Sequence, residues 1–311
     1  MFNWEVCLLT LQKVGILFAY IAIGYGLRRC KALPENSDGA LSKLVTLLFC
    51  PAYSIVILAE SMQPEALSQN LNLLGMGTLV ILASLGLALV LGKLLGRDLL
   101  EKRSVTYAMT ITNYGYFGYP LVAGVFGQQM LSDMMVFTIP IILVTNSVGY
   151  LLFVQEKVSW KKLLLTPMLL ALFVGTAIGL CGITLPVSVR DGLMMAGNCM
   201  SPVSMVLGGF VLGSLPIKEL ITGWRSYLYG ALRLVLIPAL FVAVLYVLGV
   251  RGVYLLISGA YLALPLGMNL VVFPASLGYD TRDNAKMCFV SLLLSVVTLP
   301  IVFSLLQSIS Q

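Results

Sequence analysis

Residues 113–121 read Asn-Tyr-Gly-Tyr-Phe-Gly-Tyr-Pro-Leu, and this stretch lies inside a long apolar segment. Gly115, Gly118 and Pro120 each weaken or break a helix. In lipid, a broken helix leaves backbone N–H and C=O groups unpaired, at a cost on the order of several kcal/mol each. Such a break is tolerated only where protein or a water-filled cavity covers it. Together with the amide of Asn113, the stretch is typical of a transporter's binding site, although an ordinary proline kink would use similar residues.

A second apolar segment, residues 259–278, is interrupted in the same way. Pro265 and Gly267 break its helical pattern, and Asn269 again supplies an amide. Pro120 and Pro265 are 145 positions apart, close to half of the 311 residues. Interrupted segments at matching positions of two halves indicate a binding site at the centre of a transporter.

The composition places the chain in a membrane. It is 59% hydrophobic and 10% charged with a mean hydropathy of +0.98, whereas soluble domains carry about 25% charged residues. The chain has no histidine, which excludes His-based metal sites and Ser-His catalysis, and its six cysteines lack the spacing of metal ligands. We therefore expect no enzyme activity and no cofactor. The net charge of +6 follows from basic loops on one side of a membrane and does not indicate nucleic acid.

Ten apolar segments have about the length that a bilayer requires. They are residues 8–27, 43–60, 71–95, 104–126, 134–154, 163–185, 193–215, 226–249, 253–277 and 287–308. Sixteen of the 19 basic residues then fall on one side, among them three in the connection 155–162 (Lys157, Lys161 and Lys162), and three fall on the other. The positive-inside rule puts the sixteen in the cytoplasm. We therefore predict a multi-pass protein of the cell (plasma or inner) membrane with both termini extracytoplasmic.

Five spans in each half predict an internal repeat. The halves are residues 1–154 and 155–311, and an odd number of spans inserts one half upside-down relative to the other. Pro51 in the second span and Pro202 in the seventh are 151 positions apart, which supports this division. The predicted fold class is an all-α polytopic membrane protein of ten transmembrane helices in two inverted five-helix repeats.

The broken segments also resemble a known family. Asn113-x-Gly115-x-x-Gly118-x-Pro120 is similar to a pattern of the auxin efflux carrier family, which includes plant PIN proteins and bacterial permeases. Residues 264–267, Leu-Pro-Leu-Gly, resemble the family's Leu-Pro-Gln-Gly, with leucine in place of the glutamine. The short connection 155–162 makes the bacterial branch the better match.

This resemblance implies an architecture and a function. Helices one, two, six and seven would form a scaffold, often the contact of a homodimer, and helices three to five and eight to ten a transport domain. The fourth and ninth helices would cross at their prolines, as in a PIN-like or bile acid symporter-like fold. The substrate would be a small organic anion, a mono- or dicarboxylate, carried by elevator-type alternating access. The sodium-coupled bile acid symporters themselves are less similar, because no Glu lies near Pro265.

Half-helix N-termini that meet at a break favour a carboxylate, because they present free N–H groups and the positive end of the helix dipole. The predicted substrate-binding residues are Asn113, Tyr114, Gly118, Pro120, Asn146, Pro265, Gly267 and Asn269. For Asn146 and Asn269, packing hydrogen bonds within the membrane are an equal alternative, and the tyrosines of this region favour packing.

The position of charges bears on coupling. No Asp or Glu lies at the centre of a predicted span, and a buried carboxylate is the usual proton carrier of a coupled pump. The sequence therefore favours anion uniport, with sodium- or proton-coupled symport and a non-transporting sensor or receptor as alternatives. Arg233, eight residues after Arg225, is predicted to extend to the inner surface, with matching the charge of a substrate as the alternative.

Overall fold

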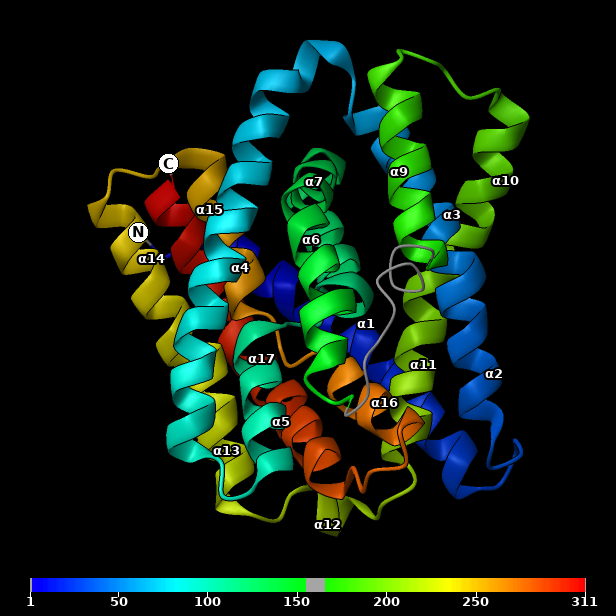
Figure 1. Cartoon of the computed structure of the whole chain (residues 1–311), viewed down its shortest axis with the longest axis vertical. Coiled ribbons are helices and arrows are strands. Elements are labelled where there is room, and N and C mark those ends of the chain that lie inside the picture. Colours follow the sequence, from blue (N-terminus) through cyan, green and yellow to red (C-terminus); the bar gives the residue numbers. More distant parts are fainter. Residues whose placement is uncertain (1, 155–165, 311) are drawn as a thin grey trace.

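The computed structural model describes residues 2–154 and 166–310, which form a bundle of helices (Figure 1). Seven stretches of this part are long and apolar enough to cross a membrane: Trp4–Arg29, Ser37–Ser61, Pro64–Leu95, Gln128–Gly149, Val187–Leu212, Trp224–Val247 and Arg282–Ser310. The prediction of an all-helical, multi-pass membrane protein is thereby confirmed. Ten spans in two inverted repeats stay a prediction.

The first half begins with α1 (Trp4–Arg29), capped by Asn3, whose side chain accepts from the N–H of Val6 at 3.1 Å. The elements that follow are α2 (Ser37–Leu44), η1 (Val45–Phe49), α3 (Cys50–Ser61), η2 (Pro64–Ala66), α4 (Leu67–Leu95), α5 (Leu99–Thr110), η3 (Tyr114–Gly118), α6 (Tyr119–Phe126), α7 (Gln128–Val144) and η4 (Thr145–Gly149). Gly127 separates α6 from α7 with a φ of 90°, a conformation that glycine adopts without strain.

The second half comprises α9 (Pro167–Leu180), α10 (Val187–Asn198), α11 (Met200–Leu212), α12 (Ile217–Leu220), α13 (Trp224–Ala231), η5 (Leu232–Leu236), α14 (Ile237–Val247), α15 (Gly252–Ala263), α16 (Asn269–Ser276) and α17 (Arg282–Ser310). Three predicted spans correspond to shorter helices. Segment 104–126 is α5, η3 and α6, and segment 253–277 is α15 and α16. The predicted segment 163–185 contains α9 and begins outside the described residues, where the connection 155–162 and its three lysines also lie.

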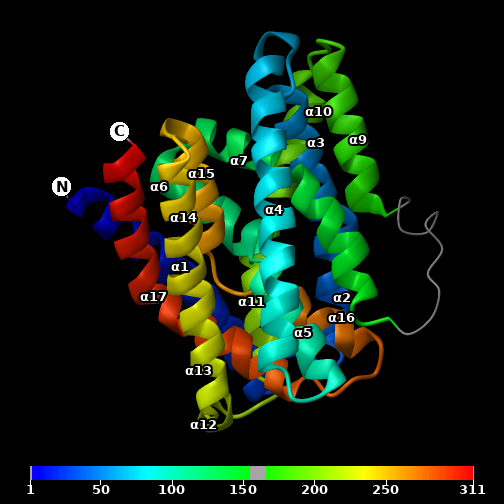
Figure 2. The ribbon, with the colours of Figure 1, turned by 60° about the vertical axis from the view of Figure 1, so that its left-hand side comes forward.

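Two sets of helix contacts stand out, and α1 joins them because it also packs on α17. In the first, α1 packs on α11, and α3 packs on both α9 and α10. In the second, α4 packs on α5 and α7, while α17 packs on α13 and α15. Both views show α2, α3, α9 and α10 gathered on one flank of the molecule, with α13 and α17 away from them (Figures 1 and 2).

Both termini lie together. The backbone N–H of Asn3 donates to Ser304 Oγ at 2.7 Å, which joins α1 to the last turns of α17. Elsewhere, Arg97, Arg225 and Arg282, from three different loops or helix ends, line one polar cleft of about 490 Å³. We call it the basic-face cleft, because its arginines belong to the sixteen basic residues assigned to one side.

Candidate functional site

The helix containing the Asn113 motif breaks between α5 and η3. Ile111 and Thr112 are β-branched, which suits extended backbone, and Ile111 has φ −107° and ψ 127°. Thr112 forms an isolated antiparallel bridge with Leu266. The N–H of Asn113 donates to the carbonyl oxygen of Pro265 at 2.8 Å, so the first break is paired directly with the second.

The second break follows from Pro265. A residue before proline is pushed toward extended backbone, and Leu264 accordingly has φ −66° and ψ 150°, which ends α15 at Ala263. The N–H of Leu266 donates to Ser291 Oγ in α17 at 3.2 Å. Ser291 itself donates to the carbonyl of Cys288 at 2.9 Å. These bonds pair backbone groups at the crossing, as a position inside a membrane requires.

The crossing lies at the prolines in only one of the two helices. Pro265 is part of the contact, but the other broken helix crosses at Ile111–Asn113, and Pro120 lies in the first turn of α6. Helical backbone continues from η3 through Gly118 and Tyr119 into Pro120, so the break in this helix lies before η3 and not at the proline. The expectation that both helices cross at their prolines is therefore wrong for Pro120.

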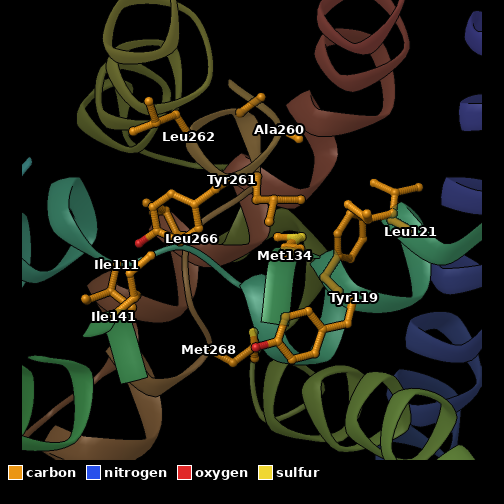
Figure 3. Packing of buried hydrophobic residues seen from close by; sticks show 14 of the residues in the cluster. Ile111, Tyr119, Leu121, Met134, Ile141, Ala260, Tyr261, Leu262, Leu266 and Met268 are labelled. Atoms are coloured by element: carbon orange, nitrogen blue, oxygen red, sulfur yellow. The ribbon is translucent and has the colours of Figure 1, made fainter. Parts of the chain in front are cut away.

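Close approach of the two segments depends on small residues. A Cβ on Gly267 would lie 3.0 Å from the carbonyl oxygen of Thr112, and a Cβ on Gly118 would overlap Leu264 Cδ1. Figure 3 shows side chains of both broken helices in one buried cluster, with Ile111 and Tyr119 from the first and Tyr261 and Leu266 from the second. The crossing is thus packed on one side.

On its other side the crossing borders a cavity of about 340 Å³. One wall consists of the two breaks and η4, and it includes Thr112, Asn113 and Thr145. The opposite wall is formed by α2, η1, α3, α9 and α11. Its polar side chains include Ser42, Thr46, Ser54 and Ser204. The lining among the described residues is otherwise mostly apolar and aromatic and contains no Asp, Glu, Lys or Arg.

The cavity brings together five of the eight predicted residues. Asn113, Tyr114, Asn146, Gly267 and Asn269 all line it. The other three, Gly118, Pro120 and Pro265, are not among its lining residues and shape the broken helices instead. The predicted residues from the two halves of the chain therefore converge on one space.

Among the three predicted amide side chains, that of Asn113 is buried with a donor that the described residues leave unsatisfied. Its side chain is 3% exposed, and Nδ2 has no hydrogen-bond partner within the described part of the chain. Asn146, by contrast, donates its Nδ2 to the carbonyl of Ile142 in its own helix at 2.9 Å. An unpaired buried amide costs about 1–3 kcal/mol, so Asn113 is suited to a ligand that accepts its hydrogen bond.

Backbone donors lie beside this amide. At the start of η3, the first backbone N–H groups that donate within the helix are those of Phe117 and Gly118. Both donate to the carbonyl oxygen of Asn113. The preceding N–H groups, including those of Tyr114 and Gly115, belong to the helix start, where intrahelical acceptors are absent. Tyr114 and Gly115 also line the cavity. The positive end of this half-helix therefore faces the same space as the Asn113 amide.

Three π-helical turns border the cavity. Thr46 belongs to η1, Tyr114 to η3 and Asn146 to η4, and all three residues are in the lining. A π turn holds one residue more than an α turn and recurs at functional sites. These turns were not predicted, because no local residue pattern specifies them.

The wall opposite the crossing was also missed. Ser54 and Ser204 are each 1% exposed and line the cavity from α3 and α11. Ser204 Oγ has no partner among the described residues. The available signal was a small polar residue inside an apolar span, which is common and not specific. In the described ranges, no three His, Cys, Asp or Glu side chains gather as metal ligands would.

Arg233 departs from its prediction. Instead of extending to the surface, its side chain is 0% exposed within η5. Its Nη1 donates to the carbonyl of Met109 in the last turn of α5 at 3.1 Å. The eight residues that separate it from Arg225 span about 12 Å of helix, and the surrounding helices cover it.

Comparison with known proteins gives two similarities. A family model described as "Membrane transport protein" matches residues 9–157 and 151–303. An uncharacterized transporter of Methanothermobacter thermautotrophicus is 23% identical over 308 residues, which cover 93% of this chain and 96% of the relative. Both similarities extend over nearly the whole chain, and the family model spans both broken helices.

Proposed function

Because the chain belongs to the auxin efflux carrier family of membrane transport proteins, we propose that it is a secondary transporter of a small organic anion. The substrate class is a mono- or dicarboxylate, bound in the cavity at the crossing. The family is one of transporters and not of enzymes, which agrees with the absence of histidine from the sequence.

The observation that carries the proposal is the unpaired amide of Asn113 on the cavity. Asn113 is 3% exposed, lies next to a half-helix N-terminus, and has a donor with no partner in the described part of the chain. Donors and helix N-termini without a neighbouring carboxylate attract anions. A carboxylate there would accept from Nδ2 of Asn113 and from the free N–H groups at the start of η3.

The cavity also supports a moving-domain mechanism. Its two walls come from different sets of helices: η1, α3, α9 and α11 belong to the proposed scaffold, and the breaks and η4 to the proposed transport domain. Elevator-type transport needs the substrate at such a boundary, so that one wall slides past the other. The proposed halves are residues 1–154 and 155–311, and the proposed homodimer would form through the scaffold.

The decisive experiment is flux of labelled malate into liposomes that contain the purified protein. Moving one net negative charge across 100 mV involves about 2.3 kcal/mol. An inside-positive potential set with potassium and valinomycin should accelerate uptake, and sodium should not be required. Protein-free liposomes and the Asn113→Ala variant are the controls.

Three results would change the proposal. Flux that ignores the potential but strictly requires a sodium or proton gradient would replace uniport by symport. Malate binding without flux would make the protein a sensor. Neither binding nor flux for malate, malonate or lactate would remove small carboxylates as the substrate class.

One observation favours proton-coupled symport as the second candidate. Asp133 in α7 is 7% exposed, and its Oδ1 accepts from the amides of Gln69 at 3.3 Å and Gln129 at 3.2 Å. No basic side chain pairs with it among the described residues. If protons are the coupling ion, Asp133→Asn should abolish proton-driven uptake while leaving malate exchange intact.

A further inference from the structure

Arg233 is the most unusual charged group of the protein. Within the described residues, it and Asp133 are the two buried charged side chains, and Arg233 is the more completely buried at 0% exposure. Arginine stays protonated in proteins. Its environment therefore holds a full positive charge inside the proposed transport domain, on the helix formed by α13, η5 and α14.

This charge is poorly compensated. Nη1 donates to the carbonyl of Met109, but Nε and Nη2 have no hydrogen-bond partner, and no carboxylate lies within 4 Å in the described part of the chain. Arg225 on the same helix is the contrast. It pairs with Glu101 and also donates to the carbonyl of Leu95 and to Tyr229.

The hydrogen bond between Arg233 and the carbonyl of Met109 places the guanidinium behind the crossing. Met109 and Thr110 form the end of α5, four and three residues before Asn113. Tyr261 donates to the carbonyl of Thr110 at 3.2 Å, so Arg233 and Tyr261 together satisfy the carboxyl end of this half-helix. The dipole at a helix end amounts to roughly half an elementary charge, which offsets only part of a guanidinium.

In its described lining, the cavity on the other side of the crossing lacks a charged group to balance an anion. Its lining among the described residues has no charged side chain, yet the proposed substrate is an anion. A buried charge without a partner is costly and marks a functional site in membrane proteins. An anion at Asn113 would lie in the field of the guanidinium with little water between them to screen it.

We propose that Arg233 is the resident counter-charge of the transported anion. It would act through space from behind the crossing, as a positioning residue that never contacts substrate. It gives an uncharged cavity its preference for anions and takes the place that a co-transported cation would occupy in a coupled carrier. This inference rests on the proposed function and adds the origin of its charge selectivity.

The test distinguishes an effect of the Arg233 charge from an effect of Arg233 capping the end of α5. Ligand-induced shifts in melting temperature would be measured in detergent with malate and lactate, each against its uncharged amide, malamide and lactamide. Arg233→Gln keeps a donor for the Met109 carbonyl and removes the charge. Arg233→Lys keeps the charge at pH values below the pKa of the buried lysine. Arg225→Gln removes a partly buried arginine of the same helix, one that is paired with Glu101, and is the matched control.

Arg233→Gln should weaken carboxylate binding about tenfold or more, because unit charges attract strongly through a low-dielectric interior. Its response to the amides should not change. Arg225→Gln should bind like the wild type. If Arg233 only caps α5, the Gln and Lys variants will both bind carboxylates with wild-type affinity, and that result overturns the inference.

Arg233→Lys supplies a second readout that holds even if the Gln variant does not fold. Burial lowers the pKa of a lysine, so this variant should lose carboxylate affinity as the pH rises from 6.5 to about 9, while the wild type stays constant. A flat profile for the Lys variant overturns the counter-charge. A wild type that binds malate and malamide equally overturns it too and leaves the cavity's transport role standing. A wild type that binds none of the four ligands removes the proposed function and this inference together.

Discussion

At the scale of single residues, Asn113 makes the sharpest prediction. Asn113→Ala removes the unpaired donor on the cavity, and the loss of one hydrogen bond to a charged ligand costs roughly 1–3 kcal/mol. Affinity for a carboxylate should therefore fall about ten- to hundredfold, measured as the ligand concentration that gives a half-maximal shift in melting temperature. The melting temperature without ligand should change little.

Asn70 offers the matched control for this substitution. It is also 3% exposed, but its Nδ2 donates to the carbonyl of Ser61 at 2.9 Å, and it does not line the cavity. Asn70→Ala should lower the melting temperature and leave carboxylate affinity unchanged. If Asn113→Ala behaves like Asn70→Ala, the amide of Asn113 has a structural role and not a binding one.

At the scale of elements, Glu101 fastens α5 to α13 at the basic-face cleft. Its Oε1 accepts from Arg225 Nε at 2.9 Å and from the Tyr229 hydroxyl at 3.0 Å, and its Oε2 accepts from Arg97 Nε at 3.0 Å. Partial burial raises the pKa of Glu101, but the hydrogen bonds from Arg97, Arg225 and Tyr229 outweigh it and hold the pKa at about 2. The carboxylate therefore stays ionised well below neutral pH.

A depressed pKa fixes the direction of the pH effect. The ionised Glu101 stabilises the fold fully above the pKa of an unfolded glutamate, about 4.3, and this contribution is lost as the pH falls toward 2. Glu101→Gln should lower the melting temperature at pH 7, and its difference from the wild type should shrink below pH 4. Glu65→Gln, at an exposed carboxylate in η2, should show neither effect. A difference that is constant from pH 7 to pH 3 would rule out the ion pairs as the cause.

The contact between α1 and α11 makes a second prediction at this scale. A Cβ on Gly209 would overlap the backbone carbonyl of Ile21, and a Cβ on Gly24 would overlap that of Val206, so these helices pack backbone to backbone. Gly209→Ala should destabilise the protein by about 1–3 kcal/mol through overpacking. Gly86→Ala in α4, where a Cβ has no neighbour within 4 Å, should leave the melting temperature equal or raise it, as the higher helix propensity of alanine favours.

At the scale of the whole molecule, the distribution of basic loops predicts the topology. Arg97 and Arg282 line the same basic-face cleft, whereas Arg190 pairs with Glu60 at 2.5 Å near the start of α10. Single cysteines at positions 97 and 282 should react with an impermeant maleimide from one side of the membrane, and a cysteine at 190 from the other. The background would carry serine at all six native cysteines. Labelling of 97 and 190 from the same side would contradict the predicted topology.

The sequence predicted those features of the fold that depend on local chemistry. Pro265 ends α15 because a residue before proline is forced out of the helical region. Asn113 lies at the predicted break, although Gly115 and Gly118 belong to the helical turn η3 that follows it. What it did not predict depends on distant partners. The burial of Arg233 is set by the helices that cover η5, and the cavity wall at Ser54 and Ser204 by the packing of α3 and α11. Neither feature can be recognised from the residues next to it in the sequence.

The absence of charged side chains from the described cavity lining determines how the charge of the cavity depends on pH. The lining groups of the described chain that can lose a proton are the thiol of Cys50 and the phenols of four tyrosines, Tyr107, Tyr114, Tyr116 and Tyr119, and such groups ionise only above about pH 8. Arg233 keeps its proton throughout. The proposed binding site therefore carries the same charge at pH 5 and at pH 7, and under anion uniport any acid optimum would follow the fraction of the proposed substrate that is present as the carboxylate.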